Sequence, residues 1–152
     1  MIAGVRIAID VGSVRIGVAK CDVEGLLATP LMTISAGPEA VSQALGLVQE
    51  YEAICVYVGK PISLAGKDTA STQLAIEFAG EIAAQLKDSA TQVRLIDERL
   101  STVSAQRGMH ESGRSVKQSR DAIDQAAAVV ILEHALASER NSGTLVGEEV
   151  EL

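Results

Sequence analysis

The chain has 152 residues, of which 47% are hydrophobic and only 2% aromatic, and its formal net charge is −7. This length fits one domain with a real core, which must be aliphatic because there is no Trp, one Phe and two Tyr. Stacking of bases on aromatic rings and a generally basic nucleic-acid-binding surface are both disfavoured. No leader segment or membrane-length apolar run is present in the sequence, so we expect a cytoplasmic protein without a membrane partner.

The first part of the chain has the pattern of a β-meander. Three strands are predicted from alternating apolar residues, at residues 5–10, 15–19 and 26–35. The first strand ends at Asp10, and short turns rich in Gly, Ser and Asp join the three. Short connections of this kind predict antiparallel pairing.

Helices and single strands alternate over the remainder of the chain. One predicted helix begins near residue 38, and three others cover residues 71–86, 101–110 and 119–139. The predicted strands cover residues 53–59 and 93–98. A meander followed by α-β-α-β-α predicts an α/β domain with a mixed sheet covered by helices. We expect this domain to span residues 1–138, and residues 139–152 to form an acidic, flexible tail.

Cysteine and histidine residues form no evident ligand set. Cys21 and Cys55 lie in or beside apolar runs, and neither has a neighbour at the spacing of a metal site or redox pair. We expect two buried, reduced thiols. His110 and His134 are expected on a loop and on a helix face.

Carboxylates stand at three places where burial would make a charge costly. Asp10 ends the first strand, Asp97 and Glu98 end the last strand, and Asp124 precedes an apolar helical run. The carboxyl ends of parallel strands meet at one sheet edge, where the last helix can bring Asp124 to the other acids. Carboxylates alone are suitable ligands for Mg²⁺ or Mn²⁺, and two such ions can promote hydrolysis of a phosphodiester.

Each acid also has a purely structural explanation. Asp10 can form an Asx turn, Asp97 or Glu98 can pair with Arg99, and Asp124 can interact with the dipole of its helix. Each explanation is adequate for its own acid, but three unrelated explanations are needed for three acids at one predicted edge. Strand alternation allows only one of Asp97 and Glu98 to face the site, and it does not decide which.

Four segments resemble successive motifs of the YqgF family, namely "IAIDVGSVRIGVAKCD", "VYVGKP", "IDERLST" and "DAIDQAAAVVIL". The resemblance covers residues 5–137. It implies an RNase H-like fold, in which helices flank a mixed five-stranded sheet of three antiparallel and two parallel strands. The family is described both as RuvC-like Holliday junction resolvases and as pre-16S rRNA nucleases. It therefore implies a bacterial cytoplasmic nuclease, a hydrolase that chiefly matures the 5′ end of 16S rRNA.

The resemblance also implies roles for individual residues. The acids that match the family's catalytic residues and metal ligands, for Mg²⁺ or Mn²⁺, are Asp10, Glu98 and Asp124. Gly12 and Gly17 match glycines that let the backbone run close to the site.

Substrate contacts are expected from a local strip of positive charge. Arg15 and Arg99 match basic positions of the motifs, and Arg107, Arg114 and Lys117 extend the strip. Neutralising phosphates needs only such a strip, although the same residues would also suit a solvated surface. Further candidates for substrate contact are Lys60, where the family pattern usually has an apolar residue, and Ser101.

Other functions stay open at this point. An actin- or sugar-kinase-like nucleotide binder also begins with an Asp-x-Gly turn, but it needs a second domain to enclose ATP. A Holliday junction resolvase-like DNA nuclease, or a non-catalytic RNA-binding factor in ribosome assembly, would keep the fold. A homodimer is plausible for a protein that grips a symmetric junction, although no heptad pattern indicates one.

Overall fold

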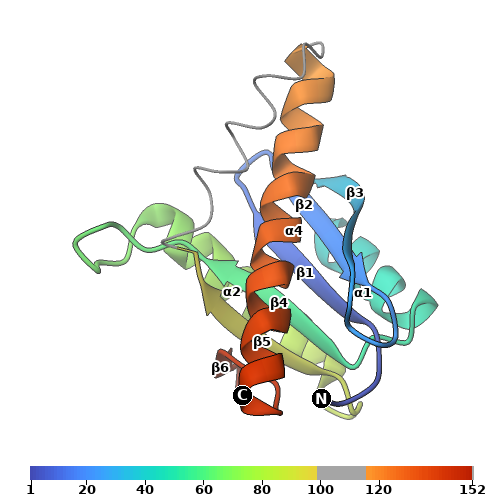
Figure 1. Cartoon of the computed structure of the whole chain (residues 1–152). Coiled ribbons are helices and arrows are strands. Elements are labelled where there is room, and N and C mark those ends of the chain that lie inside the picture. The colour runs from blue at the N-terminus through green and yellow to red at the C-terminus, as the bar shows by residue number, and fades with distance from the viewer. Residues whose placement is uncertain (99–115, 152) are drawn as a thin grey trace.

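The computed structural model describes residues 1–98 and 116–151, with the side chains of residues 116–119 excepted. A mixed sheet in the order β3-β2-β1-β4-β5-β6 forms its centre. The strands are β1 (Arg6–Val11), β2 (Arg15–Cys21), β3 (Ala28–Ser35), β4 (Cys55–Lys60), β5 (Gln92–Asp97) and β6 (Glu148–Glu149). Two helices, α1 (Ala40–Glu50) and α2 (Ala70–Leu86), cover one face, and α4 (Val116–Ser142) crosses the other face (Figure 1).

The strand pairing confirms the predicted α/β class. β1, β2 and β3 pair antiparallel, as short turns require, whereas β1, β4 and β5 are parallel and are connected through helices. The sheet has one strand more than the five that we expect from the sequence. The additional strand, β6, has two residues and pairs antiparallel with β5.

Strand alternation divides the core into two layers. In β1, Ile7 and Ile9 pack in the layer under α1 and α2, while Ala8 packs in the layer under α4. Successive side chains of a strand point to opposite faces, so Asp10 shares the α4 face with Ala8. The carboxylate therefore lies under α4 and not among the aliphatic side chains of the larger core.

α4 approaches the sheet closely because small residues line the contact. A Cβ atom added to Gly17 of β2 would lie 2.0 Å from the carbonyl oxygen of Asp124. One turn further along α4, Ala128 is fully buried against the sheet. The first half of α4 is thus held within contact distance of the strand that follows Asp10.

A buried ion pair fixes the other end of α4. The Arg6 guanidinium donates to both carboxylate oxygens of Glu139, with Nη2–Oε1 and Nε–Oε2 distances of 2.7 and 3.2 Å. The hydroxyl of Tyr57 also donates to Glu139 over 2.8 Å. Glu139 and Arg6 are at most 1% exposed, so this end of the helix is integral to the core.

The structure differs from the expectation of a free tail over residues 139–152. α4 continues to Ser142, so the expected boundary at residue 138 falls inside the helix. Beyond the helix, the backbone N–H of Val146 donates to the Tyr57 hydroxyl, and Arg94 donates to the carbonyl of Gly147. The composition of this segment is polar, but its backbone pairs with β5, and three of its apolar residues, Leu145, Val146 and Val150, pack against the core.

Two smaller expectations concern cysteines and membranes. Cys21 and Cys55 are buried free thiols, as predicted. No helix in the described parts of the chain combines the length and apolarity that crossing a bilayer requires.

Substitution of Gly17 by Ala should destabilise the protein, because the new methyl group would overlap the backbone of α4. We expect a loss of about 2 kcal/mol or more in the free energy of unfolding, measured by urea denaturation. The matched control is Gly80→Ala in α2, where an added Cβ meets no atom within 4 Å. This control should be stabilising by about 0.5–1 kcal/mol. Equal effects of the two substitutions would contradict the close packing of α4.

Candidate active site

Asp10 and Glu98 meet at the carboxyl ends of the parallel strands. Asp10 is the next-to-last residue of β1, and Glu98 directly follows β5. The backbone N–H of Glu98 donates to the carbonyl of Lys60 over 3.2 Å, which extends the pairing of β4 with β5 by one residue. The side chains of Asp10 and Glu98 are hydrogen-bonded to each other. Residues 88 positions apart in the sequence thus form one carboxyl pair.

Gly59 makes room for this pair on β4. A Cβ atom at this position would lie 2.4 Å from Oε1 of Glu98 and 2.6 Å from Cδ1 of Ile131 in α4. The Glu98 carboxyl group therefore fills the space between β4 and α4 that a larger residue would occupy. The segment "VYVGKP" contains this glycine, but the sequence alone does not reveal which side chain needs the space.

Burial and mutual repulsion favour the protonated form of the pair. The pKa of Glu98 is raised to about 9, chiefly by desolvation and also by the charge of Asp10, the hydrogen bond between the two side chains and the charge of Asp97. Desolvation also raises the pKa of Asp10, partly offset by the hydrogen bond from Glu98 and reinforced by the charge of Asp124. Without a cation, Glu98 is thus the protonated partner and donates to the Asp10 carboxylate.

The structure also decides between Asp97 and Glu98. Asp97 is exposed, whereas Glu98 is 8% exposed and contacts Asp10. Glu98 is the acid that faces α4, and the charge of Asp97 contributes to its raised pKa. This answer depends on the backbone bond to Lys60, which holds Glu98 in register beyond the strand end.

Asp124 lies near the pair but is bound to another residue. Its Oδ2 accepts a hydrogen bond from Nε of Arg15 over 2.8 Å, and the two side chains are 19% and 34% exposed. Its charge nevertheless reaches Asp10, as the raised pKa of Asp10 shows. The three predicted acids are therefore neighbours, with Asp124 turned toward β2.

The other predicted substrate contacts are only partly described. Lys60 ends β4 beside Glu98 and lies 3.6 Å from the carboxylate of Glu148, in a pair too exposed to be strong. Lys117 belongs to α4, but its side chain is outside the described part of the structure. The predicted contacts at Arg99, Ser101, Arg107 and Arg114, like His110, also lie outside the described residues. His134 is exposed on α4, as expected for a helix-face residue.

The donor chemistry at this edge fits a hard divalent cation. All three acids supply only carboxylate oxygens, and a cation between Asp10 and Glu98 would offset the repulsion that raises their pKa values. Within residues 1–98 and 116–151, however, no three acidic, His or Cys side chains are grouped closely enough to form a ready cation site. The pairing of Asp124 with Arg15 agrees with this observation.

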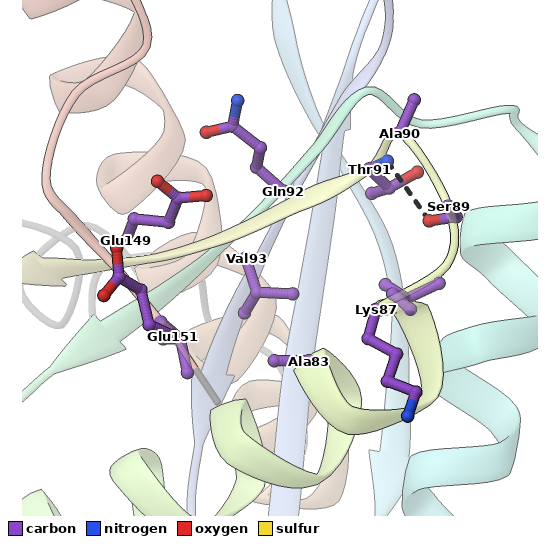
Figure 2. A pocket seen from close by; sticks show the side chains of 11 residues that line it. Ala83, Lys87, Ser89, Ala90, Thr91, Gln92, Val93, Glu149 and Glu151 are labelled. Carbon is purple, nitrogen blue, oxygen red and sulfur yellow. Dashed lines mark hydrogen bonds between the residues drawn. The ribbon is translucent and has the colours of Figure 1, made fainter.

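A separate cavity lies at the other end of β5. It has a volume of about 420 Å³ and is bordered by the end of α2, the start of β5 and the β6 segment (Figure 2). Lys87, Glu149 and Glu151 contribute charges of both signs to its walls. None of the three predicted acids lines this cavity, so it is not part of the carboxylate site.

Comparison with known proteins decides the family. The sequence model described as "RuvX: Holliday junction resolvase" matches residues 4–138. The chain belongs to the RuvX family. This result confirms the resemblance to YqgF, which is the same family.

RuvX relatives resemble this chain over nearly its whole length. A Streptomyces avermitilis protein named "Putative pre-16S rRNA nuclease" is 47% identical over 151 residues, which cover 98% of this chain and 96% of the relative. A Mycobacterium ulcerans protein with the same name is 48% identical and covers 95% of this chain and 83% of the relative.

Two solved structures share the RuvX fold. RuvC of T. thermophilus in complex with a Holliday junction substrate matches with a TM-score of 0.59 and 16% identity, over 97% of this chain and 99% of RuvC. A fowlpox virus resolvase in complex with Holliday junction DNA matches with a TM-score of 0.55 and 10% identity, over 88% of this chain and 97% of the resolvase. At these identities the likeness shows the fold alone.

Substitution of Glu98 by Gln should stabilise the metal-free protein at alkaline pH. The pKa of Glu98 rises from 4.5 in the unfolded chain to about 9 in the folded protein, so the wild type loses stability as the pH rises through this window. Gln keeps an N–H donor toward Asp10 and cannot ionise. In EDTA, we expect the stability advantage of the variant to grow by at least about 1 kcal/mol between about pH 5 and about pH 8. Urea denaturation measures it, and a pH-independent difference would contradict the buried pair.

Proposed function

We propose that this RuvX protein is a divalent-metal-dependent nuclease that hydrolyses phosphodiester bonds in the 5′ region of pre-16S rRNA. The observation that carries the proposal is the carboxyl pair of Asp10 and Glu98, with Asp124 beside it, at the carboxyl edge of the sheet. Buried like charges are unfavourable for stability, and a function that uses them explains their presence. The names of relatives at 47–48% identity support the RNA substrate and, with it, a cytoplasmic location.

Each acid has a distinct part in this proposal. Asp10 and Glu98 would hold Mg²⁺ or Mn²⁺ between their carboxylates, and Asp124 would complete the ligand set from α4. When bound, the metal supplies positive charge for activating water and stabilising the leaving oxygen. The aliphatic residues on both sides of the sheet hold the strands that carry Asp10 and Glu98, so that these two carboxylates need little reorganisation when substrate binds.

Positive side chains would position the nucleic acid. Arg15 projects from the start of β2 beside Asp124, and its planar guanidinium suits a phosphate oxygen pair. Lys60 at the end of β4 lies near Glu98 and would add a second contact. We further propose that Arg99, Ser101, Arg107, Arg114 and Lys117 extend this contact along the backbone. Binding would then weaken with rising salt, as phosphate neutralisation requires.

A second candidate substrate is a four-way DNA junction. The description of the matching family and the two junction-bound structures with the same fold favour it. A two-fold symmetric junction would be gripped by a homodimer, so a dimer in solution would accompany this alternative.

The experiment compares cleavage of a 16S precursor 5′-leader RNA and a four-way DNA junction, each with Mn²⁺ and with EDTA. Asp10→Asn, Glu98→Gln and Asp124→Asn should each lower the cleavage rate at least about a hundredfold, because each removes a proposed metal ligand. The matched control is Asp121→Asn, on α4 one turn before Asp124, which should cut at the wild-type rate. The preferred substrate distinguishes the two candidates.

Two results would contradict the nuclease proposal. Cutting that persists in EDTA, or in Asp10→Asn, would exclude a mechanism based on these carboxylates. No cutting of either substrate, together with tight RNA binding in EDTA that Asp10→Asn leaves unchanged, would indicate a non-catalytic assembly factor.

A further inference from the structure

Among the described residues, two ion pairs attach α4 to the sheet, and they differ sharply in accessibility. Arg6 and Glu139 are 0% and 1% exposed, and Glu139 also accepts a hydrogen bond from the Tyr57 hydroxyl, so this pair is not accessible to solutes. Arg15 and Asp124 are 34% and 19% exposed and lie at the edge where the carboxyl pair is located. Only the second pair can exchange partners with a molecule from solution.

Arg15 uses only part of its hydrogen-bonding capacity. Its Nε donates to Asp124, and its two terminal nitrogens donate to no residue in the described ranges 1–98 and 116–151. A half-exposed Arg–carboxylate pair contributes little to stability, whereas a guanidinium binds a phosphate with two parallel, charge-assisted hydrogen bonds. A phosphate is therefore a competitive partner for this arginine.

The carboxylate of Asp124 is needed elsewhere if the proposed function is correct. It lies close enough to Asp10 to repel it, yet it does not form a group of three ligands with Asp10 and Glu98. The peptide of Asp124 already packs against Gly17, so the backbone cannot move closer to the sheet and the carboxylate can approach Asp10 only if the side chain turns.

We propose that Arg15 is a positioning residue that holds Asp124 away from the cation site until a substrate phosphate replaces Asp124 as the partner of Arg15. In the free protein, Arg15 keeps the third ligand paired. When a phosphodiester binds Arg15, the Asp124 carboxylate is released and turns toward Asp10 and Glu98. The complete ligand set thus forms only with nucleic acid present. This inference rests on the proposed function and adds an order of binding to it.

The decisive test measures Mn²⁺ affinity by electron paramagnetic resonance in the absence of nucleic acid. Arg15→Gln should bind Mn²⁺ about threefold or more tightly than the wild type, because Asp124 is free to ligate. A merely structural role for Arg15 would leave the affinity unchanged or lower it. Lys20→Gln is the control for loss of one positive charge, since Lys20 lies at the far end of the same strand. Its Mn²⁺ affinity should equal that of the wild type.

A double variant separates release of Asp124 from a general charge effect. In the Asp124→Asn background, Arg15→Gln should no longer change the Mn²⁺ affinity. If the gain persists in that background, or if Arg15→Gln alone gives no gain, the exchange is overturned while the proposed nuclease stands. If Asp10→Asn does not lower the Mn²⁺ affinity of the wild type, the cation site itself is wrong, and the proposed function fails with it.

A second measurement tests the phosphate side of the exchange. Binding of a short single-stranded RNA is measured in EDTA, where no cleavage can occur. Arg15→Gln should weaken this binding and reduce the slope of its salt dependence by about one. An unchanged affinity and slope would show that Arg15 does not take the phosphate, and would overturn the inference.

Discussion

The close contact between α4 and the sheet is the constraint on which the rest of the structure depends. The helix can reach β2 only because Gly17 has no side chain, and it can share space with Glu98 only because Gly59 has none. At its far end the buried pair of Arg6 and Glu139 sets its position. Such a pair adds little net stability, but either charge alone would be costly, so other placements of the helix are penalised.

This constraint explains why the carboxylates tolerate one another. β1 and β5 bring Asp10 and Glu98 to one edge, where α4 buries Glu98, leaves Asp10 half-buried and adds Asp124. The raised pKa of Glu98 reflects a free energy that the aliphatic core must offset. A site that brings like charges together commonly lowers the stability of the folded protein, and binding of its ligand raises that stability again.

Much of the fold could be predicted from local patterns, whereas several features of the site could not. Alternation in residues 5–10 and the continuous apolar run before Lys60 are local signals, and both strands form as expected. The choice of Glu98 over Asp97 depends on one backbone bond beyond a strand end, which no periodicity encodes. The partnership of Arg15 with Asp124 spans 109 residues and needs the tertiary fold. The paired C-terminal segment was missed because composition indicates solvation but not strand pairing.

If the proposed function is correct, Asp10 and Glu98 jointly hold a divalent cation. Anomalous diffraction from crystals soaked in Mn²⁺ tests it directly, because manganese can be located without any assumption about activity. We predict a peak between the two carboxylates, in wild-type crystals and not in those of Asp10→Asn. Manganese found only at other acids, such as Glu149 and Glu151 beside the separate cavity, would contradict the account.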